Sequence, residues 1–156
     1  MTVAQRRGRR IMMTGTERDA YLTEQRTCRV ATVSPDGMPH VAALWFVWDG
    51  TSLWFYSLTR SLRWSQLRRD PRIAVVVDDG VGYGELRGVE LSGEVSFVGE
   101  IRRTGGTCAE LEPPEALFAT KYFGLESVPH DGRHAWLRLT PQAVRSWDFR
   151  KLSGPG

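Results

Sequence analysis

Hydrophobic positions follow a strand-like pattern over the first half of the chain. β-branched and aromatic residues dominate residues 27–33, 40–48 and 51–57, and the turn sequences SPDG and DG separate these runs. Such runs joined by tight turns are typical of antiparallel strands, so we predict a three-stranded meander over residues 27–57. Residues 72–78 are almost continuously apolar, which predicts a strand buried on both faces in the middle of the sheet.

Strand-like patterns return in the second half of the chain. Residues 85–98 read as one long strand, and Gly88 and Gly93 within it favour a bulge or a bend at the corner of a barrel. Two more strands are expected over residues 133–140 and 143–149. The total is about six to seven antiparallel strands, which predicts a small, mostly β protein built as a barrel.

Three segments have the spacing and the end signals of helices appended to this barrel. They are residues 14–26, with Thr14 or Thr16 as N-cap; residues 60–70, which end before Pro71; and residues 110–122, entered through Pro113 and Pro114. We expect one domain over residues 14–150, preceded by a disordered basic tail (1–13) and followed by a flexible C-terminus (151–156).

Composition and charge exclude several classes of protein. The 156 residues are 41% hydrophobic and 25% charged, as in a soluble globular domain. The net charge is +3, and the four arginines at positions 6, 7, 9 and 10 more than account for it. The rest of the chain has 17 basic and 18 acidic residues. A nearly neutral domain lacks the basic face of nucleic-acid-binding proteins, so we expect no nucleic-acid partner.

The chain lacks the signals of membrane insertion and secretion. No apolar run approaches the about 20 residues that span a bilayer, and no apolar leader is recognisable. Cys28 and Cys108 have no CxxC spacing. We therefore expect a cytoplasmic location, with no membrane partner and no disulfide.

Familiar catalytic motifs are also missing. The sequence has no nucleophile elbow, phosphate loop or dinucleotide fingerprint. His40 lies in a predicted strand, and His130 and His134 have i, i+4 spacing but no helical pattern and no following Glu or Asp ligand, so each is interpreted as a surface or hydrogen-bonded histidine. We predict no metal, and no catalytic residue is assigned.

The segment from Ser57 to Arg63 (SLTRSLR) is the strongest candidate site. Three hydroxyls and two guanidiniums follow a strand end within seven residues, at the start of a helix. Free N–H groups of a helix start, hydroxyls and arginine together can bind a phosphate. N-capping by Thr59 or Ser61 beside a solvated arginine explains the pattern equally well. Small residues Ala42 and Ala43 in the neighbouring strand would let a planar ring approach the backbone.

These segments resemble a known family. The segments that carry the similarity are RVATVSPDGMPHVAALWFVWDG, the strand and ST-type turn with a basic residue that follow it, LRRDPR, LRGVELSG and LRLTPQAVRSWDF. Together they are similar to the split-barrel flavin-binding proteins related to pyridoxamine 5'-phosphate oxidase. The resemblance is greatest to the actinobacterial flavin/deazaflavin oxidoreductases. It implies a split β-barrel, an obligate homodimer and a flavin-type cofactor at the dimer interface.

The resemblance also implies which residues contact the cofactor. Its phosphate-binding positions fall on Ser57, Thr59, Ser61 and Arg63, and its helix amide on Gln66. The strand whose backbone meets the cofactor ring matches Val41, Ala42 and Ala43, and the segment that the partner subunit contributes matches Leu86, Arg87 and Gly88.

The implied function is hydride transfer between such a cofactor and a conjugated small-molecule acceptor. Pyridoxamine phosphate oxidation itself is not expected, because Leu62 stands where the oxidase has an arginine. Between FMN and the deazaflavin coenzyme F420 we favour the deazaflavin, since its polyanionic tail needs extra cations and Arg60, Arg63, Arg87 and Lys121 are available. Lys121 has an alternative role as a cation at a helix C-terminus. The alternative function is a non-catalytic carrier or sensor of flavin or haem.

Overall fold

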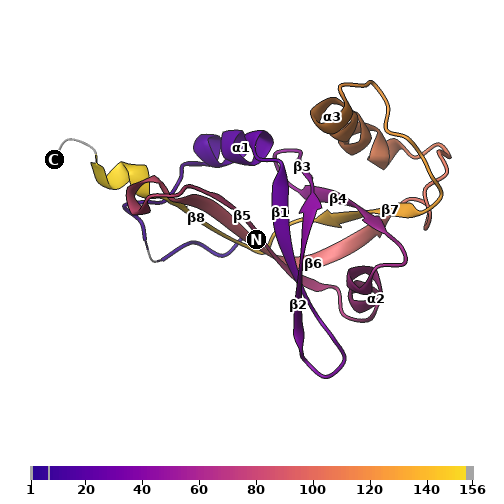
Figure 1. The fold of residues 1–156 in the computed structure, drawn as a ribbon, viewed down its shortest axis with the longest axis horizontal. Helices are drawn as coiled ribbons and strands as arrows, with labels where there is room; N and C mark the ends of the chain where they lie inside the picture. Colours follow the sequence, from indigo (N-terminus) through magenta and orange to yellow (C-terminus); the bar gives the residue numbers. More distant parts are fainter. Residues whose placement is uncertain (1, 7, 154–156) are drawn as a thin grey trace.

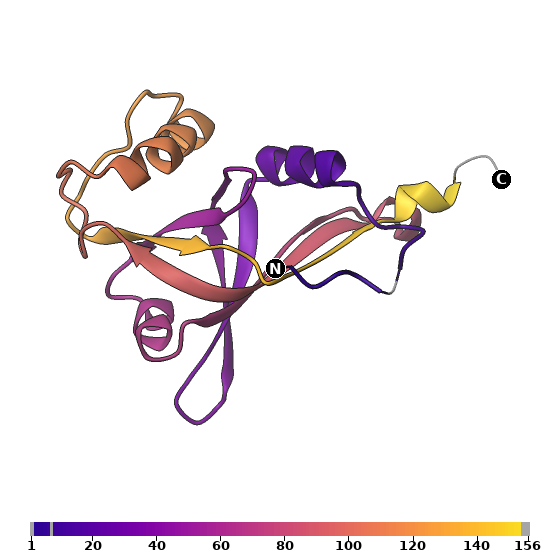
Figure 2. The same cartoon turned by 180° about the vertical axis from the view of Figure 1, so that it is seen from behind.

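The protein is described from a computed structural model that covers residues 2–6 and 8–153 (Figures 1 and 2). Within this part of the chain, eight antiparallel strands form one sheet in the order β2-β1-β5-β6-β7-β4-β3, and β8 pairs with β6. The strands are β1 (Thr27–Val33), β2 (Pro39–Trp45), β3 (Val47–Trp48), β4 (Leu53–Leu58), β5 (Arg72–Asp79), β6 (Arg87–Val98), β7 (His134–Leu139) and β8 (Ala143–Asp148). The helices are α1 (Gly15–Glu24), α2 (Leu62–Arg69) and α3 (Glu112–Phe123), with short 3-10 turns η1 (Tyr83–Glu85), η2 (Ala109–Leu111) and η3 (Phe149–Ser153).

The predicted strand over residues 40–48 is interrupted at Phe46. Its first part, β2, pairs with β1, and its second part, β3, pairs with β4. The two hairpins of the predicted meander therefore exist, but the middle strand is divided between the two ends of the sheet. Because β2 and β3 are consecutive in the chain, the sheet curls round without closing. This is the expected split barrel.

The long strand β6 changes partners along its length. Arg87–Ser92 pair with β8 and Val95–Val98 pair with β7. A Cβ at Gly93, between the two halves, would lie 3.2 Å from the backbone nitrogen of Gln142, and a Cβ at Gly88 would lie 2.2 Å from the Trp147 ring. Both glycines thus permit close approaches, and the predicted bend at Gly93 is confirmed. Beyond the bend, β5, β6 and β8 extend as an arm that ends at η1 and η3 (Figure 1).

Strand β5 lies between β1 and β6, in the middle of the sheet as expected. Ile73, Val75 and Val77 point into the core, whereas Ala74 and Val76 on the other face are half-exposed. The prediction of burial on both faces therefore holds for one face only. The outer face carries a row of small apolar residues.

The helices begin and end at the predicted signals. Thr14 and Glu17 form a capping box at the start of α1, and Ser61 caps α2, which ends before Pro71. Figure 1 shows α1 and α3 over one side of the barrel and α2 on the other. No helix in the described part of the chain is long and apolar enough to cross a bilayer.

The N-terminal segment differs from the expected solvated tail in its described residues. The backbone N–H of Val3 donates to the Gln142 carbonyl at 2.7 Å, and the N–H of Met13 donates to the Ser146 hydroxyl at 3.0 Å. The Gln5 side chain also bonds to the Ser146 backbone. Unpaired edge groups of β8 explain this arrangement, because they offer the segment hydrogen-bond partners. Residues 1, 7 and 154–156 lie outside the described residues.

Candidate cofactor site

The strand-to-helix junction after β4 holds a buried arginine. Arg63 in the first turn of α2 and Ser57 near the end of β4 are both buried. The guanidinium of Arg63 donates to the Ser57 hydroxyl from Nε at 3.2 Å and from Nη2 at 3.0 Å. Burial lowers the pKa of Arg63, and the nearby Cys28 thiol does not neutralise it, because burial raises the pKa of Cys28 and keeps the thiol uncharged. No described carboxylate pairs with Arg63, so its remaining donors fit an anion.

A cavity of about 340 Å³ lies at the same strand-to-helix junction, although neither Ser57 nor Arg63 lines it. Three arginines and two hydroxyl residues line it without any carboxylate: the full set is Leu58, Thr59, Arg60, Ser61, Arg102, Gly132 and Arg133. None of the three arginines forms an ion pair with another described residue. A phosphate fits this set of donors better than any cationic or neutral group.

Arg102 reaches this cavity from a strained backbone. Its φ of 75° is the one positive value at a non-glycine residue in the described chain. The next residue, Arg103, is buried and bonds to Glu100 at 2.6 Å and to Glu115 of α3 at 2.9 Å. Its N–H also donates to the His134 carbonyl. This network holds the loop after β6 and thereby fixes Arg102 at the cavity.

The other predicted phosphate residues have structural contacts of their own. The Ser61 hydroxyl accepts from the Trp64 N–H at 3.1 Å. Ser61 is therefore the N-cap of α2, which was the alternative explanation for this hydroxyl. The Thr59 hydroxyl donates to the Arg133 carbonyl at 3.2 Å. Gln66 is buried and its Oε1 accepts from the Thr32 hydroxyl, which fastens α2 to β1. Gln66 does not line the cavity.

A second cavity, of about 480 Å³, lies between β2 and α3. Aromatic and small residues line most of it: Thr27, Ala43, Leu44, Trp45, Tyr56, Phe118, Phe123, Val128, Pro129, Asp131 and His134. The Trp45 ring stacks on Tyr122 with 4.4 Å between centroids. The hydroxyl of Tyr56 is buried and has no hydrogen-bond partner within the described residues. Flat apolar walls with an unpartnered hydroxyl suit a planar ligand with a polar edge.

The three residues of β2 that the resemblance assigns to the ring alternate between the two faces of the strand. Val41 and Ala43 lie on the same, outer face, where Val41 is 67% exposed and Ala43 lines the aromatic cavity. Ala42 between them is half-buried on the other face. Only Ala43 therefore lies at a cavity of the single chain.

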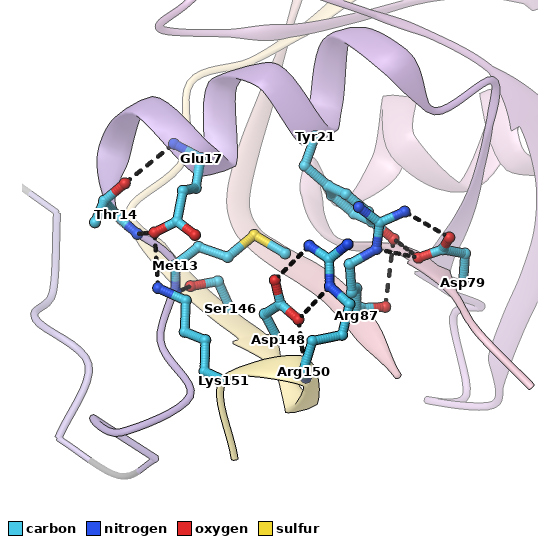
Figure 3. Close-up of polar contacts among 10 residues, drawn as sticks. All are labelled: Met13, Thr14, Glu17, Tyr21, Asp79, Arg87, Ser146, Asp148, Arg150 and Lys151. Atoms are coloured by element: carbon cyan, nitrogen blue, oxygen red, sulfur yellow. Dashed lines mark hydrogen bonds and ion pairs between the residues drawn. The ribbon is translucent and has the colours of Figure 1, made fainter. Parts of the chain in front are cut away.

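The segment Leu86, Arg87 and Gly88 lies at the end of the arm, away from α2 and α3 (Figures 1 and 2). Arg87 donates to Asp79 from Nη2 at 2.8 Å, and its guanidinium lies over the Tyr21 ring (Figure 3). The backbone N–H of Phe149 donates a hydrogen bond to the Leu86 carbonyl. Within one chain these residues cannot reach Ser57 or Arg63.

Lys121 faces the strand break between β2 and β3. Its Nζ donates to the Phe46 carbonyl at 3.2 Å and lies 4.2 Å from the centre of the Phe46 ring. The Tyr122 hydroxyl also bonds to Phe46, on both its N–H and its carbonyl. Burial, and secondarily the charge of Arg26, lower the pKa of Lys121 to about 8. Lys121 thus stabilises the break in the strand.

The four cations named for an anionic tail do not lie together within one chain. Arg87 lies on the arm, which the resemblance assigns to the site of the partner subunit, and Lys121 is bonded to Phe46. The cations beside Arg60 are instead Arg102 and Arg133. Sequence analysis missed both because they come from loops distant in the chain, although a basic pair followed by glycines (IRRTGG) was a visible signal.

Asp131 and His134, which also line the aromatic cavity, were not predicted. Asp131 Oδ2 lies 2.6 Å from His134 Nδ1, and Asp131 Oδ1 accepts the backbone N–H groups of Arg133 and His134. The spacing Asp-x-x-His in a turn is the local signal for this contact.

Comparison with known proteins agrees with this fold. The family model of pyridoxamine 5'-phosphate oxidase matches residues 15–148. Among solved structures, the conserved hypothetical protein Rv2991 of Mycobacterium tuberculosis is 30% identical (TM-score 0.80), over 99% of this chain and 95% of that one. A protein named F420 reductase is 26% identical (TM-score 0.60), over 81% of this chain and 94% of that one.

More distant structures share the fold alone. A FAD-binding protein of Mesorhizobium loti is 19% identical with a TM-score of 0.66, and the alignment covers 86% of this chain and 94% of that one. No curated protein matches the sequence. Because the family model covers nearly the whole barrel and the Mycobacterium tuberculosis protein matches along nearly the full chain, this protein belongs to the pyridoxamine 5'-phosphate oxidase family.

Proposed function

We propose that the protein is an oxidoreductase that binds a flavin-type cofactor and uses it to transfer hydride to a conjugated small-molecule acceptor. The observation that carries this proposal is the strand-to-helix junction after β4, which holds the buried guanidinium of Arg63 without a carboxylate partner and a cavity that three further arginines line. A buried charge without a carboxylate costs stability, and a bound phosphate would offset that cost. When bound, the cofactor supplies the electrons and the hydride, while the chain supplies anchoring and a shaped cavity.

The two cavities suit such a cofactor and its acceptor. Arg60, Arg102 and Arg133 would hold the phosphate and any anionic extension. The ring system would extend to the edge of the aromatic cavity, and the space beside Ala43 and the unpartnered Tyr56 hydroxyl would be left for the acceptor. His134 lies between these regions, because it is the first residue of β7 and pairs with Leu58 at the end of β4.

We favour the deazaflavin over FMN as this cofactor. A single phosphate rarely needs three arginines in addition to Arg63, whereas a polyanionic tail does. The similarity to the protein named F420 reductase, at 26% identity, supports the same choice.

A homodimer would complete the site. The outer face of the sheet presents Val41, Ala31 and Ala74 in one row, with Val41 67% exposed. Two such faces could pack in an isologous interface. The arm of one subunit, with Leu86, Arg87 and Gly88, would then be available to the cofactor of the other.

Titration of the purified apo-protein tests the proposal. We expect micromolar or tighter binding of the deazaflavin, weaker binding of FMN, and weaker binding still of riboflavin, which lacks the phosphate. Oxidation of the bound, reduced cofactor is then followed by stopped-flow over a panel of enones and quinones. Acceptor-independent oxidation at the rate of the free cofactor would favour a carrier, and a lack of binding to every flavin would refute the proposal.

A further inference from the structure

The aromatic cavity contains a histidine whose orientation is fixed. His134, the first residue of β7, lines the cavity together with Asp131. Its Nδ1 lies 2.6 Å from Asp131 Oδ2, and its ring lies 4.8 Å from that of Tyr56, which in turn stacks on Trp136 at 4.7 Å. One hydrogen bond and one ring contact therefore set the direction of the imidazole.

The charge of Asp131 determines which nitrogen of His134 carries the first proton. Burial opposes ionisation of Asp131, but hydrogen bonds from the Arg133 N–H and from His134 outweigh it and lower the pKa of Asp131. An ionised carboxylate only accepts hydrogen bonds, so Nδ1 must be the donor. The second nitrogen, Nε2, has no hydrogen-bond partner within the described residues. A proton on Nε2 is consequently free for a ligand.

We propose that His134, oriented by Asp131, donates the proton that completes the reduction of an acceptor bound in the aromatic cavity. This inference rests on the proposed function and adds to it a proton donor and a class of substrate. The substrate class is that of α,β-unsaturated carbonyl compounds with a flat, apolar skeleton, because the walls are aromatic and one edge carries His134 and Tyr56.

The proton and electron balance requires such a donor. The β-carbon of the acceptor receives hydride from the reduced cofactor, and the electrons of the C=C bond move toward the carbonyl to give an enolate. The N–H bond at Nε2 of the protonated His134 then breaks, and the proton forms a new C–H bond at the α-carbon. The neutral imidazole regains a proton from solvent, and its partner Asp131 stays ionised throughout.

Few other groups face His134. They are Asp131 from the preceding loop, Tyr56 from β4, and Arg103, whose N–H donates to the His134 carbonyl at 2.6 Å. Burial and the charge of Asp131 raise the pKa of Tyr56, so its hydroxyl stays neutral. His134 is thus the group of this set whose second ring nitrogen is available to a ligand in the cavity.

A coloured phenol tests the proposal without turnover. 4-Nitrophenol binds as an analogue of the enolate, and its absorbance reports whether it is ionised. We expect the apo-protein to bind the phenolate in preference to the phenol, and His134→Gln to lose about 10- to 100-fold of phenolate affinity, the range for a hydrogen bond to a charged group. Glutamine keeps a donor toward Asp131 but cannot carry the charge. Equal phenolate affinity in both proteins, or no binding to either, would overturn the proposal.

Two further variants separate proton donation from a structural role. Asp131→Asn keeps an oxygen for the two backbone N–H groups but presents an N–H to Nδ1, so the phenolate preference should fall while the fold is kept. His130→Gln is the matched control, because His130 bonds to Glu115 and does not line the cavity. It should behave as wild type. An equal loss in His130→Gln would assign the effect to the loop and overturn the proposal.

Turnover provides an independent measurement. With the loaded enzyme, His134→Gln should lower kcat at least about tenfold with little change in KM. If the protein binds no flavin, the proposed function fails, yet the phenol measurement still reports on His134. If turnover is found and His134→Gln does not alter it, the proton donor lies elsewhere and the proposed function stands.

Discussion

The guanidinium of Arg63 donates to the Ser57 hydroxyl from two nitrogens, at 3.2 and 3.0 Å, with both side chains buried and no carboxylate paired to the arginine. A neutral hydroxyl only partly compensates a buried positive charge. The fold therefore holds this charge at a cost that only an anion would offset. A site of this kind is expected to trade stability of the empty protein for affinity.

Replacing Arg63 by methionine should separate these two effects. Arg63→Met removes the unpaired charge while filling similar space, so we expect the apo-protein to unfold at a higher temperature. Affinity for a phosphorylated cofactor should fall by about 1.5–3 kcal/mol. Calorimetric unfolding and titration with FMN measure the two quantities. Arg68→Met in the exposed part of the same helix is the control and should leave FMN affinity unchanged.

Replacing Arg102 by glycine should also separate the stability of the apo-protein from its affinity for the cofactor. Glycine adopts a φ of 75° without strain, so Arg102→Gly should cost the apo-protein no stability and gain up to about 1 kcal/mol. Loss of an exposed cation should weaken binding of an anionic cofactor by about 0.5–1 kcal/mol at low salt, and less at high salt. Riboflavin, which has no phosphate, provides the comparison. An equal loss for riboflavin would exclude Arg102 from the anion site.

The sequence predicts the elements of this fold better than their connections in space. Thr14, Ser61 and the two prolines at the start of α3 act locally, so the helices begin where expected. The division of the apolar run at Phe46 depends on contacts with Lys121 and Tyr122, more than 70 positions away in the chain. No local pattern records such contacts.

The same difference holds for the candidate site. Ser57 and Arg63 are brought together by one strand-to-helix turn, which a motif can reveal. Arg102, Asp131 and His134 join the site from loops that Arg103 fastens to α3 and β7. Their placement follows from tertiary ion pairs that no local pattern records. The prediction that His134 is a surface or hydrogen-bonded histidine is confirmed by its contact with Asp131.

The proposed dimer can be tested on the outer face of the sheet. Ala74→Glu places a charge in the row of small residues formed with Ala31 and Val41. If two such rows meet across a two-fold axis, the carboxylates repel and lose their hydration, so the variant should be monomeric at micromolar concentration. Light scattering measures the mass. Ser96→Glu, at an exposed position of β6, should leave the mass of the wild type. A wild-type monomer would contradict the interface.

Lys121 predicts a pH dependence of stability. Burial lowers the pKa of Lys121 to about 8, against 10.5 for an ordinary lysine. Between these values the folded protein has released the proton that the unfolded chain still binds, so this residue makes the free energy of unfolding increase as pH rises. Lys121→Met lacks this titration, so its free energy of unfolding relative to wild type should be most favourable near neutral pH and should decline toward pH 10.5, whatever constant amount the loss of the Phe46 contact subtracts. Denaturant unfolding at a series of pH values gives the difference, and a constant one would contradict the lowered pKa.

The space beside Ala43 provides the most direct test of whether the protein is an enzyme or a non-catalytic cofactor carrier. Ala43 lies in β2 on the wall of the aromatic cavity, which Trp45 and His134 also line. Phenylalanine at this position would fill the volume in which an acceptor must come within about 3–3.5 Å of the hydride-bearing carbon. Ala43→Phe should therefore reduce the rate of acceptor reduction far more than it reduces cofactor affinity.

Stopped-flow oxidation of the bound, reduced cofactor measures this rate, and titration of the same variant measures the affinity. Ala43→Ser adds only a hydroxyl and is the matched control, with both quantities expected near wild type. If Ala43→Phe loses cofactor and turnover together, the aromatic cavity holds the cofactor ring itself. The acceptor would then have to enter from the side on which the partner subunit's arm is expected.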